Sequence, residues 1–230
     1  MIKLLGRVPD TLCVAVSGGS DSMAALNFVL NNSRRKVVAL HFNHGTKHSD
    51  DAEAFVRGYC RKNGIPVVIG RTHRDIEKGE SREAYWRSER YRFFGSWTTS
   101  GELCDTISKW SNDSFTKYFL NAPIITCHHL DDAVETWIFT SLHGKSRLIP
   151  YKRDNFIRPF LLNRKSEFDY WCDRYNIPYI SDPSNTDTAY MRNFIRHELM
   201  PQALTVNPGL HKVVMKKIMS SHREGFVDTI

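Results

Sequence analysis

Residues 12–22 read Leu12-Cys13-Val14-Ala15-Val16-Ser17-Gly18-Gly19-Ser20-Asp21-Ser22. An apolar run meets two glycines, and apolar residues then recur at helical spacing from Met23 to Leu30, which predicts a buried strand, a tight turn and a helix. Glycines let a backbone approach an anion closely, and the N–H groups of such a turn and helix N-terminus bind phosphate. The serines add donors, and Asp21 can ligate the Mg²⁺ that accompanies pyrophosphate. The alternative for this segment alone is a serine-capped turn without a ligand.

Further strands are predicted by the apolar runs Val37–Phe42, Pro66–Ile69 and Ile124–Cys127. Helical patterns follow these runs, over about 49–62, 81–94 and 130–142. Strands that alternate with helices pair in parallel, so the sequence predicts an α/β fold with a doubly wound, mostly parallel sheet. In such sheets ligands lie beyond the carboxyl ends of the strands. The unusual motifs Ser17–Ser22, His41–Gly45 and His128–Asp132 all fall there, which predicts one shared site.

The rest of the chain is less regular. Residues 95–121 carry Gly, Ser, Thr and Asn, and we interpret them as an insertion with one short helix near 115–120. Helical patterns return over Asn163–Tyr175 and Ala189–Met200, and a weakly amphipathic tail begins at Asn207. We therefore expect one domain over residues 1–205 and a short helical tail over 206–230.

Composition narrows the class of protein. The chain has 230 residues, 41% of them hydrophobic, and a net charge of +7 that favours a polyanionic partner. The basic stretch 143–165 fits the same view, although a solvated loop would explain it equally well. No secretory signal or membrane-spanning run is visible, so we expect a cytoplasmic protein. Five scattered cysteines without a CxxC pair argue against a disulfide framework or a zinc knuckle.

Two rival nucleotide and metal motifs fail. Gly144-Lys145-Ser146 resembles the end of a Walker A loop, but the position that needs the first glycine is Phe139, inside a helical pattern. Cys127-His128-His129 is a poor zinc chelate, because neighbours on a strand point to opposite faces.

The Ser-Gly-Gly-x-Asp-Ser loop resembles the PP-loop (N-type) ATP pyrophosphatases, which have an adenine nucleotide alpha hydrolase-like fold. Within that superfamily the chain is similar to the tRNA(Ile)-lysidine synthases. The similar segments are His41-Phe42-Asn43-His44-Gly45, Glu83–Tyr91, His128–Thr136, Arg158–Leu161, Asp182–Asn185, Arg192–Arg196, and Leu199 with Pro201. They span residues 12 to about 210 and are together far more specific than any one of them.

The resemblance implies a reaction with ATP, Mg²⁺, free lysine and a tRNA(Ile) with a CAU anticodon. ATP adenylates the C2 oxygen of the wobble cytidine, and the lysine ε-amine then displaces AMP from C2. Typical members carry further C-terminal tRNA-binding domains, and we expect these to be absent because the chain stops at Ile230.

The resemblance also implies residue roles. The expected catalytic residues are Asp21, Arg87, His128 and Asp132. The expected ATP-binding residues are Ser17, Gly18, Gly19, Ser20, Asp21, Ser22, His41, Asn43, His44 and Gly45. Lysine is expected at Asp132 and Glu135, and tRNA at Arg158, Arg192, Asn193 and Arg196. Asp21 and Asp131 are the expected Mg²⁺ ligands.

Residue spacing supports some of these roles. Asp132 and Glu135 share one helix face and could hold an ammonium, although acidic residues also simply complement a helix N-terminus. Arg192 and Arg196 could bind RNA phosphates, or form ion pairs with Asp182, Asp187 or Glu198.

Other functions stay open. A PP-loop tRNA thiolase would need paired cysteines near the loop, and a non-catalytic RNA-binding relative would have lost the carboxylates. Enzymes that synthesise GMP or NAD would leave the basic stretch unexplained. The loop His143–Arg147 also departs from the Arg-Gly sequence that is usual for the lysidine synthases at this place.

Overall fold

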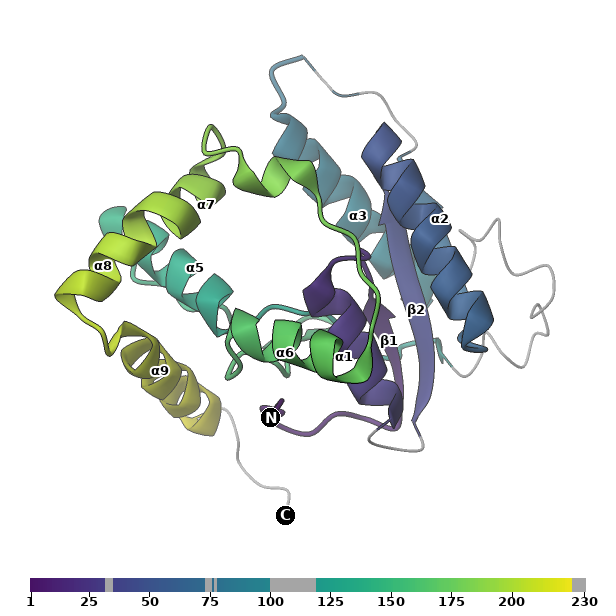
Figure 1. Ribbon diagram of the computed structural model, residues 1–230, viewed down its shortest axis with the longest axis horizontal. Coiled ribbons are helices and arrows are strands. Elements are labelled where there is room, and N and C mark those ends of the chain that lie inside the picture. Colours follow the sequence, from purple (N-terminus) through teal and green to yellow (C-terminus); the bar gives the residue numbers. More distant parts are fainter. Residues whose placement is uncertain (32–34, 73–75, 77, 100–118, 225–230) are drawn as a thin grey trace.

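The computed structural model describes residues 1–31, 35–72, 76, 78–99 and 119–224. In this part of the chain one six-stranded sheet has the strand order β3-β2-β1-β4-β6-β5 (Figure 1). The strands are β1 (Thr11–Ala15), β2 (Lys36–Asn43), β3 (Val67–Arg71), β4 (Ile124–Ile125), β5 (Lys152–Arg153) and β6 (Phe156–Ile157). All neighbours pair in parallel except β5 and β6. The predicted α/β class with a mostly parallel sheet is therefore confirmed.

Helices connect the strands and continue to the end of the described chain. They are α1 (Ser20–Asn31), α2 (Lys47–Lys62), α3 (Arg82–Thr99), α5 (Leu130–Leu142), α6 (Lys165–Tyr175), α7 (Met191–Phe194), α8 (Met200–Val206) and α9 (Leu210–Glu224). A 3₁₀ turn, η1 (Pro183–Thr186), precedes α7, and a π-helical segment, η2 (Ile195–Leu199), joins α7 to α8. None of the described helices has the length and apolar character needed to cross a membrane.

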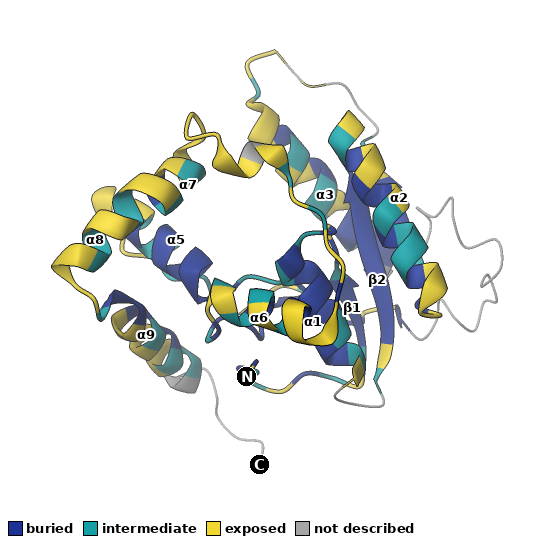
Figure 2. Ribbon diagram, viewed as in Figure 1, coloured by how far each residue is buried: buried dark blue, intermediate teal, exposed yellow. Residues whose placement is uncertain are grey.

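Successive side chains of β1 and β2 point to opposite faces of the sheet, so the core has one layer on each face. Leu12 and Val14 pack with buried residues of α1, α2 and α6, whereas Cys13 packs with buried aromatic residues of α3. The sheet thus carries helices on both faces, as in doubly wound folds (Figure 2). Strand order reverses between β1 and β4, and ligands of such sheets bind in the crevice at that reversal.

A third cluster lies beside the sheet. Leu210, Val214 and Ile218 recur every four residues along α9 and pack against α5, η2 and α8. This apolar stripe makes α9 an integral part of the packed structure. The domain boundary after residue 205 stays a prediction.

Three element boundaries differ from the expectation. β2 runs from Lys36 to Asn43, one residue further at each end than the predicted run Val37–Phe42, so Asn43 also lies inside the strand. α3 continues to Thr99, and thus takes in the first residues of the predicted insertion, because Trp97 is buried against the sheet. The helix predicted near 115–120 falls almost wholly outside the described residues. The helical pattern that begins at Ala189 is interrupted by η2 and ends at Val206.

Gly70 on β3 is a close-contact position. A Cβ placed there would lie 2.4–2.7 Å from the ring atoms of Phe93. We expect Gly70→Ala to lower the free energy of unfolding by about 1–3 kcal/mol, because overpacking forces strain on the core. Gly58→Ala on α2 is the control, since its Cβ would meet nothing within 4 Å and alanine favours the helix. Urea unfolding measures both; equal midpoints would contradict the prediction.

Candidate active site

The segment Ser17–Ser22 forms a turn between β1 and α1, as predicted. The backbone N–H groups of Ser17 and Gly18 donate to Ser22 Oγ at 3.1 and 3.2 Å, and Ser22 Oγ donates to Gly19 O at 2.9 Å. Gly18 has φ +95°, a conformation that side chains other than glycine rarely adopt. These two N–H groups thus converge on the Ser22 hydroxyl, and a phosphate at this place would meet the N-terminus of α1. We call the segment Ser17–Ser22, which includes the first residues of α1, the phosphate loop.

The chain after α6 crosses the phosphate loop. Ile180 N donates to Gly18 O at 3.0 Å, and a Cβ on Gly18 would lie 3.2 Å from the Ile180 side chain. Figure 1 shows this connection running past the first turn of α1 towards α7. The glycine is therefore needed for close packing as well as for its backbone conformation.

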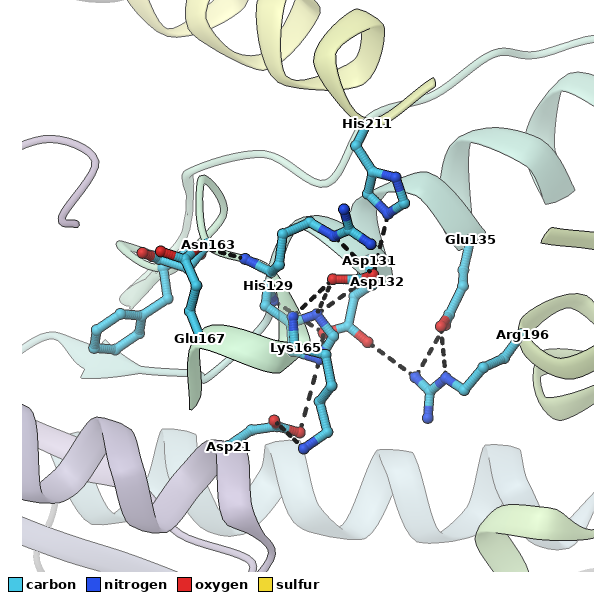
Figure 3. Close-up of polar contacts among 12 residues, drawn as sticks. Asp21, His129, Asp131, Asp132, Glu135, Asn163, Lys165, Glu167, Arg196 and His211 are labelled. Atoms are coloured by element: carbon cyan, nitrogen blue, oxygen red, sulfur yellow. Dashed lines mark hydrogen bonds and ion pairs between the residues drawn. The ribbon is translucent and has the colours of Figure 1, made fainter. Parts of the chain in front are cut away.

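Asp21 lies beside the side chains of Lys165 and His129 (Figure 3). Lys165 Nζ is 3.0 Å from Asp21 Oδ1, and His129 Nε2 is 3.7 Å from Asp21 Oδ2. Burial alone would raise the pKa of Asp21, but His129 and Lys165 outweigh it and lower the pKa below its ordinary value. Asp21 is thus an ionised carboxylate beside the phosphate loop, the type of group that magnesium prefers. Among the described residues no group of three or more His, Cys, Asp or Glu could hold a metal, so phosphate oxygens would have to complete the site.

Lys165 was not predicted as a site residue. Its Nζ donates to Ser20 Oγ at 2.5 Å and to Asp169 Oδ1 at 2.6 Å. Burial opposes its charged form, yet Asp21 and Asp169 raise the pKa of this lysine. The sequence contained only an indirect signal, a lysine followed four residues later by Asp169. The structure adds what spacing could not, a fixed ammonium beside the phosphate loop.

Asp131 has a different environment from the one expected for a metal ligand. Its Oδ2 accepts from Lys165 N at 2.8 Å, while its Oδ1 lies 3.3 Å from Arg164 Nε and 3.1 Å from His211 Nε2. Both oxygens are therefore used to hold the first turn of α6 and the start of α9 (Figure 3). These contacts favour a structural role for Asp131, so we retain only Asp21 as a predicted Mg²⁺ ligand.

Asp132 and Glu135, predicted to bind lysine, do converge on one place. Arg192 Nη2 donates to Asp132 Oδ1 at 2.6 Å, and Arg192 Nε donates to Glu135 Oε2 at 3.1 Å. Arg196 Nε donates to Glu135 Oε1 at 2.6 Å, and Arg196 Nη2 reaches both carboxylates at 3.2–3.3 Å. We call these four side chains the charge quartet. The ion pairs expected for the arginines exist, but with Asp132 and Glu135 instead of Asp182, Asp187 or Glu198.

The quartet is asymmetric in exposure. The carboxylate side chains are only 10% and 3% exposed, whereas those of Arg192 and Arg196 are 50% and 31% exposed. Burial alone would raise the pKa of Asp132. The neighbouring His129 and Arg192 outweigh this effect and lower the pKa to about 2. Asp132 is thus ionised, and the more exposed guanidinium groups cover both buried acidic side chains.

The two neighbouring histidines differ in surroundings. His129, which sequence reasoning passed over, is buried between Asp21 and Asp132, at 3.7 and 3.5 Å from their Oδ2 atoms. His128 bonds to Thr126 Oγ1 at 3.0 Å, and burial together with Arg158, Arg192 and Arg90 lowers its pKa to about 4. His128 is therefore neutral near pH 7.

The sequence predicts both Arg158 and Asn193 at the tRNA surface. Arg158 is only 4% exposed, and its Nη1 donates to Pro150 O at 3.0 Å, which does not support a direct RNA contact. Asn193 is half-buried, and its Nδ2 donates to Asp187 O at 2.9 Å; its contact with tRNA stays a prediction. Arg87, by contrast, is exposed and stacks over the Tyr91 ring at 4.7 Å.

The side chains of the segment His41–Gly45 are held by contacts within the protein. His41 is buried and its Nδ1 bonds to Val16 O at 2.8 Å. Asn43 is held by Glu53 at 2.8 Å, and its own Oδ1 accepts from Gly45 N at 2.8 Å. His44 packs between Phe42 and Trp86. Direct contact of these side chains with ATP stays a prediction. Because the side chains already have partners within the protein, the backbone of the segment is more available to ATP.

Comparison with known proteins gives a consistent picture. A family model described as PP-loop domain matches residues 3–203. The tRNA(Ile)-lysidine synthase of Staphylococcus aureus strain COL is 31% identical over 234 residues, which cover 96% of this chain and 50% of that protein. That of Thermotoga maritima is 31% identical over 225 residues, 93% of this chain and 50% of that protein.

Among solved structures, the NH3-dependent NAD synthetase of Campylobacter jejuni is 13% identical, with a TM-score of 0.43 over 96% of this chain and 89% of that one. This likeness is too low to bear on the argument. The chain spans about half the length of the curated relatives that it matches. Because the family model covers most of its residues, including the phosphate loop, the chain belongs to the PP-loop domain family.

Proposed function

We propose that the chain carries the catalytic domain of a tRNA(Ile)-lysidine synthase and uses ATP, free lysine and a CAU-anticodon tRNA(Ile). The observation that carries the proposal is the proximity of the phosphate loop to a pair of buried carboxylates, joined through His129. The names of relatives that are 31% identical over more than nine-tenths of the chain support it. We expect the protein to act in the cytoplasm, where its tRNA substrate occurs.

In the first step, the C2 oxygen of the wobble cytidine attacks the α-phosphorus of ATP and pyrophosphate leaves. The phosphate loop would hold the triphosphate, and the ammonium of Lys165 would offset its negative charge from the side of Asp21. Mg²⁺, held by Asp21 and phosphate oxygens, would supply further charge neutralisation. Arg87, exposed and supported by the Tyr91 ring, is our choice for contact with the α-phosphate.

In the second step, the lysine ε-amine attacks C2 and AMP leaves. Asp132 and Glu135 are acidic side chains, the type of group that would hold the incoming ammonium. In the free protein their charge is already balanced by two guanidinium groups, so the ammonium must share or replace one of them. The neutral imidazole of His128 and the two carboxylates are the groups that can accept the proton that the amine releases.

Arg192 is the residue through which the quartet could contact RNA. Its guanidinium is fixed by two carboxylates but half exposed, so its outer edge is available to a phosphate. We expect Arg192→Met to weaken tRNA binding and to reduce the slope of log affinity against log salt by about 0.7–0.9, the range for one phosphate contact on single-stranded or duplex nucleic acid. ATP binding should not change. Filter binding at several salt concentrations measures the slope.

Arg174→Met is the matched control for Arg192→Met. Arg174 is exposed on α6 and donates to the Tyr170 hydroxyl at 3.0 Å, so the variant removes the same charge from another surface. An equal loss of salt dependence in both variants would mean that only net charge matters. An unchanged slope in Arg192→Met would exclude a phosphate contact at this residue.

A tRNA thiolase remains the main alternative enzyme. Cys127 directly precedes His128 and His129, but burial, Asp21 and Asp132 raise the pKa of its thiol, so it stays protonated and is a poor nucleophile. A non-catalytic RNA-binding protein is the alternative from another class. It would bind tRNA without ATP turnover.

The deciding experiment incubates the protein with ATP, labelled lysine and unmodified CAU-anticodon tRNA(Ile). We expect label on the RNA and one AMP per lysine incorporated, and the same tRNA with the wobble cytidine replaced by uridine is the control. RNA binding without label and without AMP would favour the non-catalytic alternative. AMP release that ignores lysine would point to another PP-loop modification.

A further inference from the structure

Helix α9 begins after residue 203, where the match to the PP-loop domain ends, yet it places a polar side chain in the site. His211, in its first turn, is 6% exposed. The apolar stripe Leu210, Val214 and Ile218 fixes α9 against α5, so the position of His211 is determined by core packing. A buried imidazole in a helix-packing surface requires a polar partner.

That partner is Asp131. His211 Nε2 lies 3.1 Å from Asp131 Oδ1, which fixes one oxygen of the carboxylate (Figure 3). The other oxygen, Oδ2, accepts from Lys165 N at 2.8 Å. Asp131 therefore joins the start of α9 to the first residue of α6.

The link continues to the phosphate loop. Lys165 Nζ lies 3.0 Å from Asp21 Oδ1 and 2.5 Å from Ser20 Oγ. Because Asp131 holds the backbone of Lys165, a rotation of its carboxylate would shift the base of the same side chain that reaches Asp21. His211 opposes that rotation from the far side. A contact from α9 thus helps to hold the ammonium beside the phosphate loop, together with Arg164 Nε, which lies 3.3 Å from the same Asp131 oxygen.

We propose that His211 is a positioning residue for nucleotide binding, which acts through Asp131 to hold Lys165 beside the phosphate loop. The proposal rests on the proposed use of ATP. It makes α9 part of the nucleotide site and not only a support for α5. His211 itself does not contact the reacting atoms.

The test measures MgATP binding by titration calorimetry on the full chain. We expect His211→Leu to raise the dissociation constant for MgATP about 10-fold, which corresponds to about 1.4 kcal/mol of binding free energy lost when the ammonium is displaced. Lys165→Met should give a larger change in the same direction. His211→Gln keeps an N–H donor near the position of Nε2 and should restore most of the affinity. A role confined to packing would not distinguish Gln from Leu in this way.

Val214→Ala is the control for packing. Val214 is fully buried on the same helix, and its truncation should lower the melting temperature without changing the affinity for MgATP. With lysine and tRNA present, His211→Leu should raise the KM for ATP and leave the KM for lysine unchanged, because the charge quartet is intact. Unchanged MgATP binding in His211→Leu, or equal losses in His211→Leu and Val214→Ala, would overturn the role of His211 alone. Failure of the unaltered protein to bind MgATP would overturn the proposed function as well.

Discussion

Asp21→Asn should lower lysine-dependent AMP release by at least about 100-fold, the usual effect of removing one preorganised electrostatic group from a transition state. The neutral amide keeps the size of the side chain but loses the charge that faces Lys165 and His129. Without it the ammonium of Lys165 is free to turn to Asp169 alone, and a Mg²⁺ ligand is lost. Binding of tRNA should survive, since the partly exposed arginines Arg192 and Arg196 pair with Asp132 and Glu135 and not with Asp21.

The matched control for Asp21 is Asp169→Asn. Asp169 contacts the same Lys165 Nζ at 2.6 Å and is similarly exposed, but it lies on α6 and accepts from Ser20 Oγ of the phosphate loop at 3.0 Å. We expect this variant to keep its rate within a few-fold, because Asp21 still holds the lysine. AMP release can be followed by chromatography of the reaction mixture. Normal turnover in Asp21→Asn would exclude the phosphate loop as the site of ATP activation.

The nucleotide end of the site could be predicted because its signals are local. The apolar run Leu12–Val16, the glycines and the following helical pattern lie within twenty residues of one another. Each has a direct physical meaning, since a strand, a left-handed turn and a helix N-terminus depend on neighbouring residues. The parallel class followed from alternation of such units. The reversal of strand order between β1 and β4 then places the motifs together.

The pairing of charges could not be predicted in this way. Arg192 and Asp132 are 60 residues apart, and His211 and Asp131 are 80 residues apart. Periodicity reports which side of a helix is apolar, but not which distant helix will lie opposite. The sequence therefore identified the arginines and the carboxylates as separate sites, for tRNA and for lysine, and missed that they contact one another.

Burial produced the other misjudgements. Arg158 lies in a basic stretch, which favours a surface position, but its guanidinium is enclosed and donates to Pro150 O. Asn43 looked like a residue beyond a strand, yet β2 is longer than its apolar run because Asn43 finds a buried partner on α2. In both cases a hydrogen-bond partner eight to ten residues away satisfied a polar group that would otherwise stay at the surface.

Glu135→Gln should raise the KM for lysine at least about 10-fold, because the site loses the charge that attracts the ammonium. Glu135 accepts from Arg192 Nε and from two nitrogens of Arg196 at 2.6–3.2 Å. With glutamine, two guanidinium groups share the single carboxylate of Asp132, and the quartet changes from neutral to +1. It then repels a cationic substrate. The KM for ATP should stay the same.

The effect of Glu135→Gln on stability must be measured separately from its effect on lysine binding. Breaking a buried ion pair lowers the free energy of unfolding by about 3–5 kcal/mol, and by less where the arginines are partly exposed. Glu89→Gln on α3 is the matched control, because Glu89 is equally buried and bonds to Arg92 at 2.6 Å. It should lose stability by a similar amount and keep a normal KM for lysine. The double variant Glu135→Gln with Arg196→Gln makes the quartet neutral again and should recover stability. It should not recover lysine use if the ammonium requires the second carboxylate. A Glu135→Gln enzyme with an unaltered KM for lysine would mean that the quartet only ties α5 to η2, and that lysine binds elsewhere.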